Sequence, residues 1–223
     1  TLSTMFGSHL QGMPIIAENG TYVVRDGVDI SSSTIDPNLT REVITGVRQL
    51  RNDGHDVGLV VATKSIAYLE RGDDPFVSHV ATYYHSHRIV KDLSEHTDDV
   101  IKLSIYDFRE ASEATYPTMQ RTAPEHQVIL ATPNWVDIMN PGVNKGSAVE
   151  AVQRDLGVTA DQTAIFGDFL NDLEMMPMAK WSFAMANGHP NIVKASNYVA
   201  PPNTENGVIT VLAALLGTRV PIT

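Results

Sequence analysis

The stretch Gly167–Asp172, with the sequence Gly-Asp-Phe-Leu-Asn-Asp, constrains the fold of this chain more than any other. It follows the short apolar run Thr163–Phe166, which indicates a buried parallel strand. It precedes Leu173–Met176, which is typical of the first turn of a helix. The glycine and the two aspartates are therefore predicted to lie in a loop at the C-terminal end of a strand. Ligands of open α/β sheets bind at that end.

The polar residues of this loop indicate a metal site. Asp168, Asn171 and Asp172 carry side-chain oxygens close together in the sequence, and a hard cation such as Mg²⁺ prefers oxygen ligands. One interpretation is therefore a bound Mg²⁺. The motif by itself leaves a second interpretation open, in which the loop is merely polar and Asp172 caps the following helix.

A lysine stands at the start of another predicted helix. Apolar residues recur at helical spacing over Ala148–Leu156, and Gly157 is a typical residue just beyond a helix end. Lys145 therefore lies at the N-terminus of this helix, where the helix dipole does not favour a cation. Its position is better explained by a nearby anion or acidic cluster, and the alternative is an ordinary solvated lysine.

Taken together, these stretches resemble the haloacid dehalogenase-like (HAD) phosphatases, specifically the Cof-type subfamily with a large α+β cap. The resemblance is dense over residues 136–216 and also covers residues 14–22. The segments that carry it are Ile16–Gly20 (Ile-Ala-Glu-Asn-Gly), Asp137–Gly146, Gly167–Asp172 with Met175, Ala184–Gly188 with Val193 and Lys194, and Glu205–Val208.

The resemblance implies an α/β fold with two parts. A HAD-like Rossmannoid core with a parallel sheet would comprise residues 1–27 and 141–223. An inserted α+β cap domain would comprise residues 28–140. In the cap, the sequence predicts a helix that begins at Asp36-Pro37 and another over Arg109–Arg121. Strands are predicted at Val57–Thr63, Val100–Tyr106, Val128–Ala131 and Trp135–Met139, and a last core helix would pack Val208, Val211, Leu212 and Leu215 against the sheet.

The resemblance also implies an activity, a Mg²⁺-dependent phosphatase that hydrolyses sugar phosphates or similar small phosphomonoesters through an aspartyl-phosphate. Asp168 would be a direct Mg²⁺ ligand. Asp172 would complete the metal pocket, through water or by orienting Lys145. Lys145 would pair with the nucleophile and with the transferring phosphoryl group.

Three asparagines are implied near the phosphate. Asn171 would donate an amide hydrogen bond there or support the metal loop, and it is expected to be a catalytic residue beside Lys145. The residues expected to contact the substrate or its phosphate are Asn171, Asn187 and Asn19.

One part of the family pattern lies outside these residues. Family members begin with a strand that ends in Asp-x-Asp-Gly, whose first aspartate is the nucleophile, and no Asp-x-Asp occurs in this sequence. We expect the nucleophile on a segment that precedes Thr1, and we expect the 223-residue chain alone to be inactive. Two alternatives stay open: a phosphomutase of the same superfamily, and a non-catalytic protein that binds phosphorylated metabolites.

Composition narrows the possible partners to small molecules. The net charge of −10 argues against nucleic acid, whose phosphates are bound by clustered Lys and Arg. The chain has no cysteine, which excludes disulfides and thiol chemistry and fits a cytoplasmic protein. No apolar run has the length of a membrane span. The expected partner is a small phosphorylated metabolite, and the sequence carries no indication of the oligomeric state.

Overall fold

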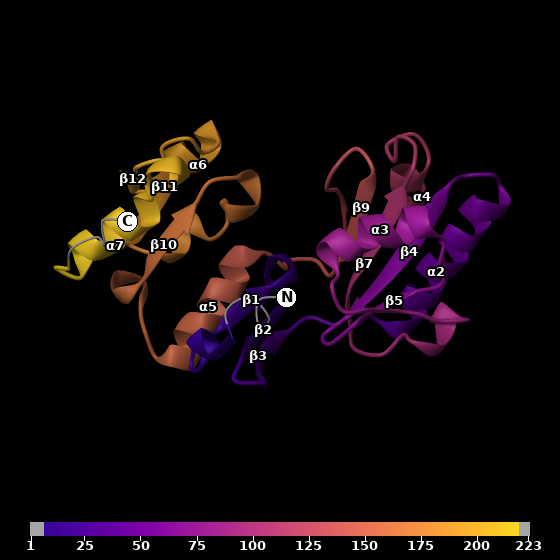
Figure 1. Cartoon of the computed structure of the whole chain (residues 1–223), viewed down its shortest axis with the longest axis horizontal. Coiled ribbons are helices and arrows are strands. Elements are labelled where there is room, and N and C mark those ends of the chain that lie inside the picture. Colours follow the sequence, from indigo (N-terminus) through magenta and orange to yellow (C-terminus); the bar gives the residue numbers. More distant parts are fainter. Residues whose placement is uncertain (1–6, 219–223) are drawn as a thin grey trace. The chain divides into compact units, whose positions relative to one another are not determined.

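A computed structural model describes residues 7–218, apart from the side chains of Ser8 and His9. The chain divides into two compact units (Figure 1). Unit 1 contains Arg25–Val143 together with the described residues up to Pro14, and unit 2 contains Ile15–Val24 together with the described residues from Asn144 onwards. Helices and strands alternate in both units, which confirms the predicted α/β class.

Unit 1 is built on a six-stranded sheet with the strand order β6-β5-β4-β7-β9-β8. Neighbouring strands are antiparallel except β5 and β6, which are parallel. The strands are β4 (Val57–Thr63), β5 (Ala67–Leu69), β6 (His87–Ile89), β7 (Val100–Asp107), β8 (Gln127–Leu130) and β9 (Trp135–Met139). The four strands predicted from apolar runs are β4, β7, β8 and β9, and each of their ends lies within one residue of the expected position. The short strand β3 (Val28–Ser32) also lies in this unit.

Helices cover both faces of this sheet. Helix α2 (Pro37–Asn52) begins where predicted, because the Asp36 carboxylate accepts a hydrogen bond from the backbone N–H of Asn38. Its buried face packs on one sheet face together with α4 (Thr115–Thr122), while α3 (Asp74–Tyr83) packs on the other face. The helix-face residues predicted from the sequence, Leu39, Val43, Val47 and Leu50, are all buried.

The second predicted helix of unit 1 is shorter than expected. The sequence predicts a helix over Arg109–Arg121, but the residues just before Thr115 form turns and α4 starts only at Thr115. Asp107 explains the difference, because its carboxylate accepts hydrogen bonds from the Arg109 backbone N–H at 2.9 Å and from the Thr115 hydroxyl at 2.6 Å. These two bonds fix the intervening segment as a loop.

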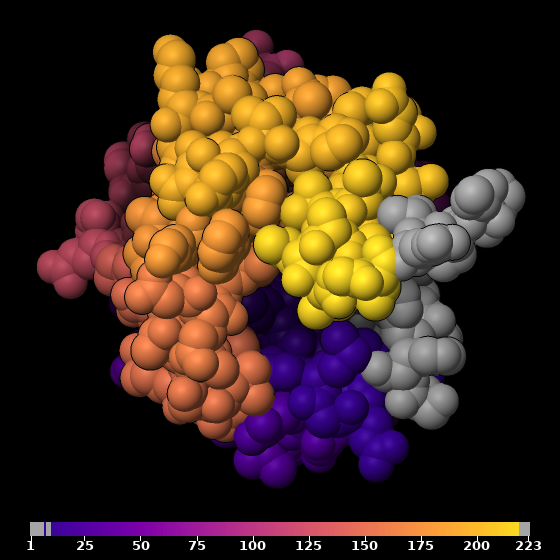
Figure 2. Space-filling model, turned by 90° about the vertical axis from the view of Figure 1, so that its left-hand side faces the viewer, coloured from indigo at the N-terminus to yellow at the C-terminus, as the bar shows by residue number. Residues whose placement is uncertain are grey.

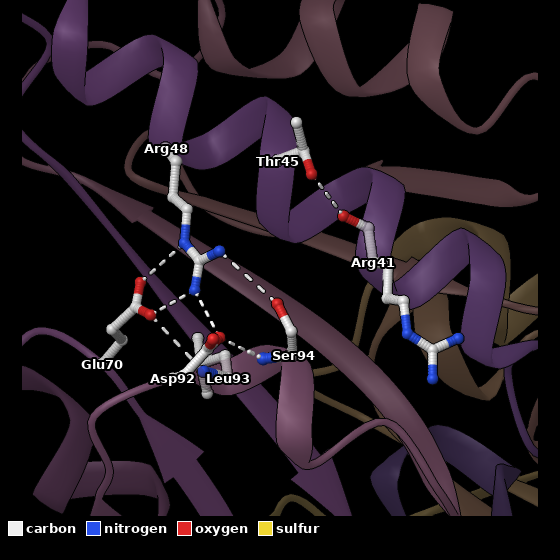
Figure 3. Close-up of polar contacts among 7 residues, drawn as sticks. All are labelled: Arg41, Thr45, Arg48, Glu70, Asp92, Leu93 and Ser94. Atoms are coloured by element: carbon white, nitrogen blue, oxygen red, sulfur yellow. Dashed lines mark hydrogen bonds and ion pairs between the residues drawn. The ribbon is translucent and has the colours of Figure 1, made fainter.

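A charged cluster joins α2 to two loops of unit 1 (Figure 3). The Arg48 guanidinium donates hydrogen bonds to Glu70 and, at 2.7 Å, to Asp92. The hydrogen bond from Arg48, followed by that from the Ser94 backbone N–H, lowers the pKa of Asp92 to about 2. The hydrogen bond to Glu70 is the main cause that raises the pKa of Arg48. The cluster therefore fixes the turn η3 (Leu93–Glu95) against α2.

We predict that this cluster makes the stability of unit 1 sensitive to acid. Because folding lowers the pKa of Asp92 from 3.8 to about 2, the stabilisation is complete above pH 4 and is lost as the pH falls towards 2. Asp92→Asn should lower the melting temperature at pH 5 and should converge on wild type near pH 2. Thermal unfolding monitored by circular dichroism measures this. Asp98→Asn, an exposed carboxylate outside the cluster, is the control, and parallel curves for Asp92→Asn and wild type would contradict the prediction.

Unit 2 contains a parallel sheet with the strand order β10-β11-β12. Its strands are β10 (Ala164–Gly167), β11 (Trp181–Met185) and β12 (Tyr198–Ala200), and its helices are α5 (Lys145–Leu156), α6 (Pro190–Ala195) and α7 (Gly207–Leu215). Strand β1 (Ile15–Ala17) pairs in antiparallel fashion with β2 (Tyr22–Arg25) across the 3-10 turn η2 (Glu18–Gly20). Apolar residues of α5, β10, β11 and α6 form the main core of the unit.

Two expectations for unit 2 are wrong. Leu173–Met176 does not start an α-helix, and two 3-10 turns, η5 (Leu170–Asp172) and η6 (Met176–Met178), occupy this region. Pro177 accounts for the second turn, since it has no N–H to continue a helix. The face of α7 is also only half buried, because Val208 and Val211 pack on the core whereas Leu212 and Leu215 are 38% and 45% exposed.

None of the helices within residues 7–218 is both long and apolar enough to cross a lipid bilayer.

Candidate active site

The loop after β10 is organised around a buried carboxylate. The 3-10 turn η5 brings Asp172 back over the start of the loop, where it is only 4% exposed. Its Oδ2 atom accepts hydrogen bonds from the backbone N–H groups of Asp168, at 2.9 Å, and Phe169, at 3.3 Å. Asp172 therefore binds the backbone of its own loop and does not cap a following helix.

The second carboxylate oxygen of Asp172 binds Lys145. The Lys145 Nζ atom lies 2.5 Å from Asp172 Oδ1, so the ammonium group predicted to need an acidic neighbour has one. Burial by itself raises the pKa of Asp172. The hydrogen bonds that its carboxylate accepts from Lys145 and from the Asp168 N–H, together with the positive charge of Lys145, lower the pKa by more than burial raises it. The net pKa of Asp172 is lower than its usual value, so this side chain is a carboxylate at neutral pH.

Local structure at the start of α5 places Lys145. Asn144 caps the helix by accepting a hydrogen bond from the Ser147 N–H at 2.9 Å, and Gly157 ends it in the left-handed conformation. Gly146 allows close approach, because a Cβ atom at this position would lie 2.3 Å from the backbone oxygen of Glu174. The helix start and the loop after β10 are therefore in direct contact.

We predict that Gly146→Ala separates these two segments. The added methyl group cannot fit against the Glu174 carbonyl, so the start of α5 must shift and Lys145 must move relative to Asp172. Overpacking of this kind costs about 1–3 kcal/mol in the free energy of unfolding. Chemical denaturation measures the cost, and Glu150→Ala on the exposed face of the same helix is the control. An unchanged unfolding free energy for Gly146→Ala would contradict the prediction.

Asp168 differs from Asp172 in its surroundings. Its backbone is fixed, since the carbonyl oxygen accepts a hydrogen bond from the His189 N–H at 2.7 Å. Its side chain is exposed, and within the described part of the chain its carboxylate has no hydrogen-bond or ion-pair partner. The carboxylate is therefore available to a ligand, whereas both oxygens of Asp172 are already engaged.

Lys145, Asp168 and Asp172 line one cavity of unit 2. Its volume is about 410 Å³, and Figure 2 shows a hollow bordered by the orange and yellow segments of this unit. Apolar side chains form most of the remaining wall. The lining residues are Ile16, Lys145, Phe166, Gly167, Asp168, Asp172, Met175, Met185, Asn203 and Val208. The cavity thus combines an apolar interior with a cation and two carboxylates.

The three predicted asparagines take part in two amide pairs. Asn171 donates a hydrogen bond to Asn19 Oδ1 at 3.2 Å, which links the loop after β10 to the left-handed turn η2. Asn187 donates to Asn203 Oδ1 at 2.8 Å and accepts a hydrogen bond from the Asn203 N–H at 3.3 Å. The first pair joins two predicted site residues, and the second joins Asn187 to a residue that lines the cavity.

Asn203 and the apolar wall of the cavity are not indicated by any motif in the sequence. Asn203 begins the turn η7 (Asn203–Glu205), just before the stretch singled out as the entrance to the last helix. Pro201 and Pro202 precede it and indicate a loop, but they do not indicate that this loop borders the cavity. Apolar residues such as Phe166 and Met185 look like ordinary core residues in the sequence.

The chain's own side chains offer few metal ligands. Among residues 7–218, no group of three or more His, Asp or Glu side chains is placed to hold a metal ion. The available carboxylate is that of Asp168. Mg²⁺ commonly binds one or two protein carboxylates and completes its coordination with water and substrate phosphate. The donor set is therefore compatible with Mg²⁺ and does not form a site enclosed by protein alone.

Comparison with known families identifies the chain. The model of the haloacid dehalogenase-like hydrolase family matches residues 3–212. The chain belongs to this family. Membership confirms the resemblance seen in the motifs and makes the protein an enzyme of the hydrolase class.

Individual relatives agree with this assignment. The 5-amino-6-(5-phospho-D-ribitylamino)uracil phosphatase YbjI of Escherichia coli (strain K12) is 27% identical over 226 residues, which cover 99% of this chain and 80% of YbjI. A crystal structure from Eubacterium rectale has a TM-score of 0.86 and 24% identity, and the match covers 96% of this chain and 82% of that one. For the HAD subclass IIB sugar phosphatase BT4131 the TM-score is 0.71 and the identity 20%, with coverage of 97% and 80%. At these identities the structural matches confirm the predicted HAD-like fold.

Proposed function

We propose that the protein is a Mg²⁺-dependent phosphatase that hydrolyses small phosphomonoesters through an aspartyl-phosphate. The observation that carries this proposal is the cavity at the C-terminal end of β10, where the Lys145–Asp172 ion pair borders the available carboxylate of Asp168. Phosphoryl transfer requires mainly positioning and neutralisation of negative charge. A fixed ammonium group and a carboxylate suited to a hard cation provide both. The phosphatase names among its relatives support the same activity.

In this proposal Asp168 holds the metal and Asp172 positions the site. Mg²⁺, when bound, would neutralise charge on the phosphoryl oxygens. Asp168 is the group in the cavity whose carboxylate is available, so we assign it as the direct ligand. Asp172 was predicted either to ligate the metal or to orient Lys145. Its engaged oxygens favour the second role, in which it aligns Lys145 and the backbone of Asp168.

Lys145 would bind the phosphoryl group. An ammonium group has three N–H donors, and Asp172 occupies one of them at 2.5 Å. The remaining donors can bind a phosphoryl oxygen and the carboxylate of a nucleophile. Asn171, held by Asn19, would donate an amide hydrogen bond near the same phosphate, while Asn187 would act through the loop that carries Asn203.

The nucleophile would be an aspartate carried by a strand outside these 223 residues. Within the described residues β10 pairs with β11 on one side, and its other edge has no neighbouring strand. A parallel strand added at this edge would end beside Lys145 and Asp168. The aspartate oxygen would bond to phosphorus as the ester P–O bond breaks and the alcohol takes up a proton. Water would then attack phosphorus, which releases inorganic phosphate and restores the carboxylate.

Substrate choice is assigned to unit 1, which we propose to be the cap domain. A domain that closes over the site excludes water and contacts the leaving group. The YbjI relative is named for a phosphorylated ribitylamino-uracil and the BT4131 relative for sugar phosphates. Small phosphorylated metabolites of these kinds are the proposed substrates.

The test is release of inorganic phosphate by the full-length protein. We expect hydrolysis of sugar phosphates with Mg²⁺, loss of activity on chelation with EDTA, and recovery when Mg²⁺ is restored. Activity that persists in EDTA would contradict the metal requirement. A strict need for a bisphosphate activator would favour a phosphomutase, and tight binding of a phosphate ester without any turnover would favour a non-catalytic binder.

A further inference from the structure

Two of the described residues that line the cavity of unit 2 carry side-chain N–H donors. They are Lys145 and Asn203. The other polar side chains in this wall are the carboxylates of Asp168 and Asp172, which accept hydrogen bonds but do not donate them. An anion bound in the cavity can therefore receive side-chain hydrogen bonds from the described wall only at Lys145 and Asn203.

The topology of the sheet brings Asn203 to the same edge as Asp168. Strands β10, β11 and β12 are parallel neighbours. Asp168 directly follows β10, Asn187 lies two residues beyond β11, and Asn203 lies three residues beyond β12. Because the carboxyl ends of parallel strands meet at one edge of a sheet, these three loops are neighbours. The place of Asn203 in the cavity wall therefore follows from the order of the strands.

The backbone of the loop that carries Asn203 is held in place. The Asn206 N–H donates to the Asn203 carbonyl at 3.3 Å, and the Gly207 N–H donates to the Pro202 carbonyl at 3.3 Å. Gly207 also lets this loop lie against the start of α7, because a Cβ atom at this position would lie 1.9 Å from the Pro201 carbonyl oxygen. The side chain of Asn203 is therefore presented from a fixed turn, and a donor that is fixed in advance needs little reorganisation to bind an anion.

Asn187 determines how the amide of Asn203 is oriented. The backbone N–H of Asn203 can only donate, so the Asn187 atom that it contacts at 3.3 Å is the oxygen Oδ1. The other end of the Asn187 amide is then its Nδ2 donor, which lies 2.8 Å from the side-chain oxygen of Asn203. The Nδ2 group of Asn203 has no hydrogen-bond partner among the described residues. Asn187 therefore holds the acceptor end of the Asn203 amide and leaves its donor end available.

We propose that Asn203 donates a hydrogen bond to the phosphoryl group in the cavity and that Asn187 orients this donor. This inference rests on the proposed phosphatase function, in which the phosphoryl group lies beside Asp168 and Lys145. The charge of a transferring phosphoryl group is spread over three oxygens. Asn203 binds an oxygen that Lys145 does not bind. Asn203 is thus a phosphate-binding residue, and Asn187 is a positioning residue that acts through it.

Inorganic phosphate is the probe for this inference, because it carries the group that Asn203 is inferred to bind. Its affinity for the full-length protein with Mg²⁺ is measured by isothermal titration calorimetry. Asn203→Ala removes the Nδ2 donor, and the affinity should fall about 10- to 100-fold, the range expected for one hydrogen bond to a charged group. An affinity equal to that of wild type would overturn the proposal.

Two further variants separate the lost donor from other effects. Asn203→Asp keeps an acceptor for the Asn187 amide but has no N–H donor, and its affinity for phosphate should fall at least as far as that of Asn203→Ala. A loss in Asn203→Asp without a loss in Asn203→Ala would come from the added charge alone and would overturn the proposal. Asn191→Ala is the matched control, because Asn191 is an exposed asparagine of α6 outside the cavity wall, and it should bind phosphate as wild type does.

A double-mutant cycle tests the role of Asn187. Asn187→Ala releases the amide of Asn203, so phosphate affinity should fall, but by a smaller factor than in Asn203→Ala. In a protein that already carries Asn203→Ala, the substitution of Asn187 should have no further effect, because the donor that it orients is absent. Equal effects of Asn187→Ala in the two backgrounds would overturn its positioning role.

Phosphate binding needs no turnover, so the two proposals can fail separately. A wild-type protein that binds phosphate through Asn203 but hydrolyses no ester would overturn the phosphatase proposal and support this one. Ester hydrolysis by wild type, together with an unchanged phosphate affinity in Asn203→Ala, would support the phosphatase proposal and overturn this one. A wild-type protein that does not bind phosphate would also overturn it.

Discussion

Replacing Asp168 with alanine in the full-length protein is expected to abolish Mg²⁺-dependent phosphatase turnover while leaving the fold intact. Removal of one fixed group that stabilises developing charge typically costs about 10²–10³ in rate, and loss of the metal ligand should cost at least as much. The Asp168 side chain is exposed and holds no other described residue. The melting temperature should therefore stay within about 2 °C of wild type, because a substitution at an exposed site typically changes the free energy of unfolding by about 0.5 kcal/mol or less.

Phosphate release under saturating Mg²⁺ and thermal unfolding of the same sample measure both parts of this prediction. Glu174→Ala is the matched control, because Glu174 is an exposed carboxylate on the same segment that does not line the cavity. Near-normal turnover of Asp168→Ala would reject its proposed role. A large fall in melting temperature would instead mean that Asp168 supports the loop.

Replacing Lys145 with glutamine is expected to reduce both turnover and stability. Turnover should fall about 10²- to 10³-fold, because the site loses the cation proposed to bind the phosphoryl group. Stability should fall by about 1–3 kcal/mol, because the buried Asp172 carboxylate loses its charged partner and is left to its backbone donors. This combined loss distinguishes Lys145 from Asp168.

The same substitution should move the acid transition. The hydrogen bond from Lys145 is the main cause that lowers the pKa of Asp172, and burial opposes it. In the wild type, the stabilisation from Asp172 is present above its unfolded pKa near 4 and is lost as the pH falls below it. In Lys145→Gln the pKa of Asp172 rises, so stability should already decline at higher pH. Melting temperatures between pH 3 and 7 measure the shift.

A double substitution sharpens the test. Lys145→Gln with Asp172→Asn removes the unpaired buried charge and should recover part of the stability without recovering turnover. Lys180→Gln is the control, because this lysine forms an exposed ion pair with Asp161. Wild-type turnover in Lys145→Gln would remove the ammonium group from the mechanism. Additive losses in the double variant would show that Lys145 and Asp172 act independently.

Local patterns determined most elements of this protein. The helix α2 is fixed by Asp36 and Pro37 at its start and by an apolar face that any packing partner must cover. The helix α5 is bounded by Asn144 and Gly157, and β4 is a continuous apolar run. In each case the deciding interactions lie within a few residues of one another, so the sequence alone carries them. The placement of Asp168 after a parallel strand follows for the same reason.

The assembly of the site was decided only by the tertiary structure. Lys145 and Asp172 are 27 positions apart and Asn19 and Asn171 are 152 apart, so no local pattern specifies their contact. The engagement of both Asp172 oxygens, which supports its proposed role in orienting Lys145, depends on how η5 folds back over Asp168. Packing also leaves Leu212 and Leu215 exposed and Phe169 beside His189. The sequence shows which side chains are available for a site, whereas the packing of elements that are distant in the sequence determines which of these side chains come into contact.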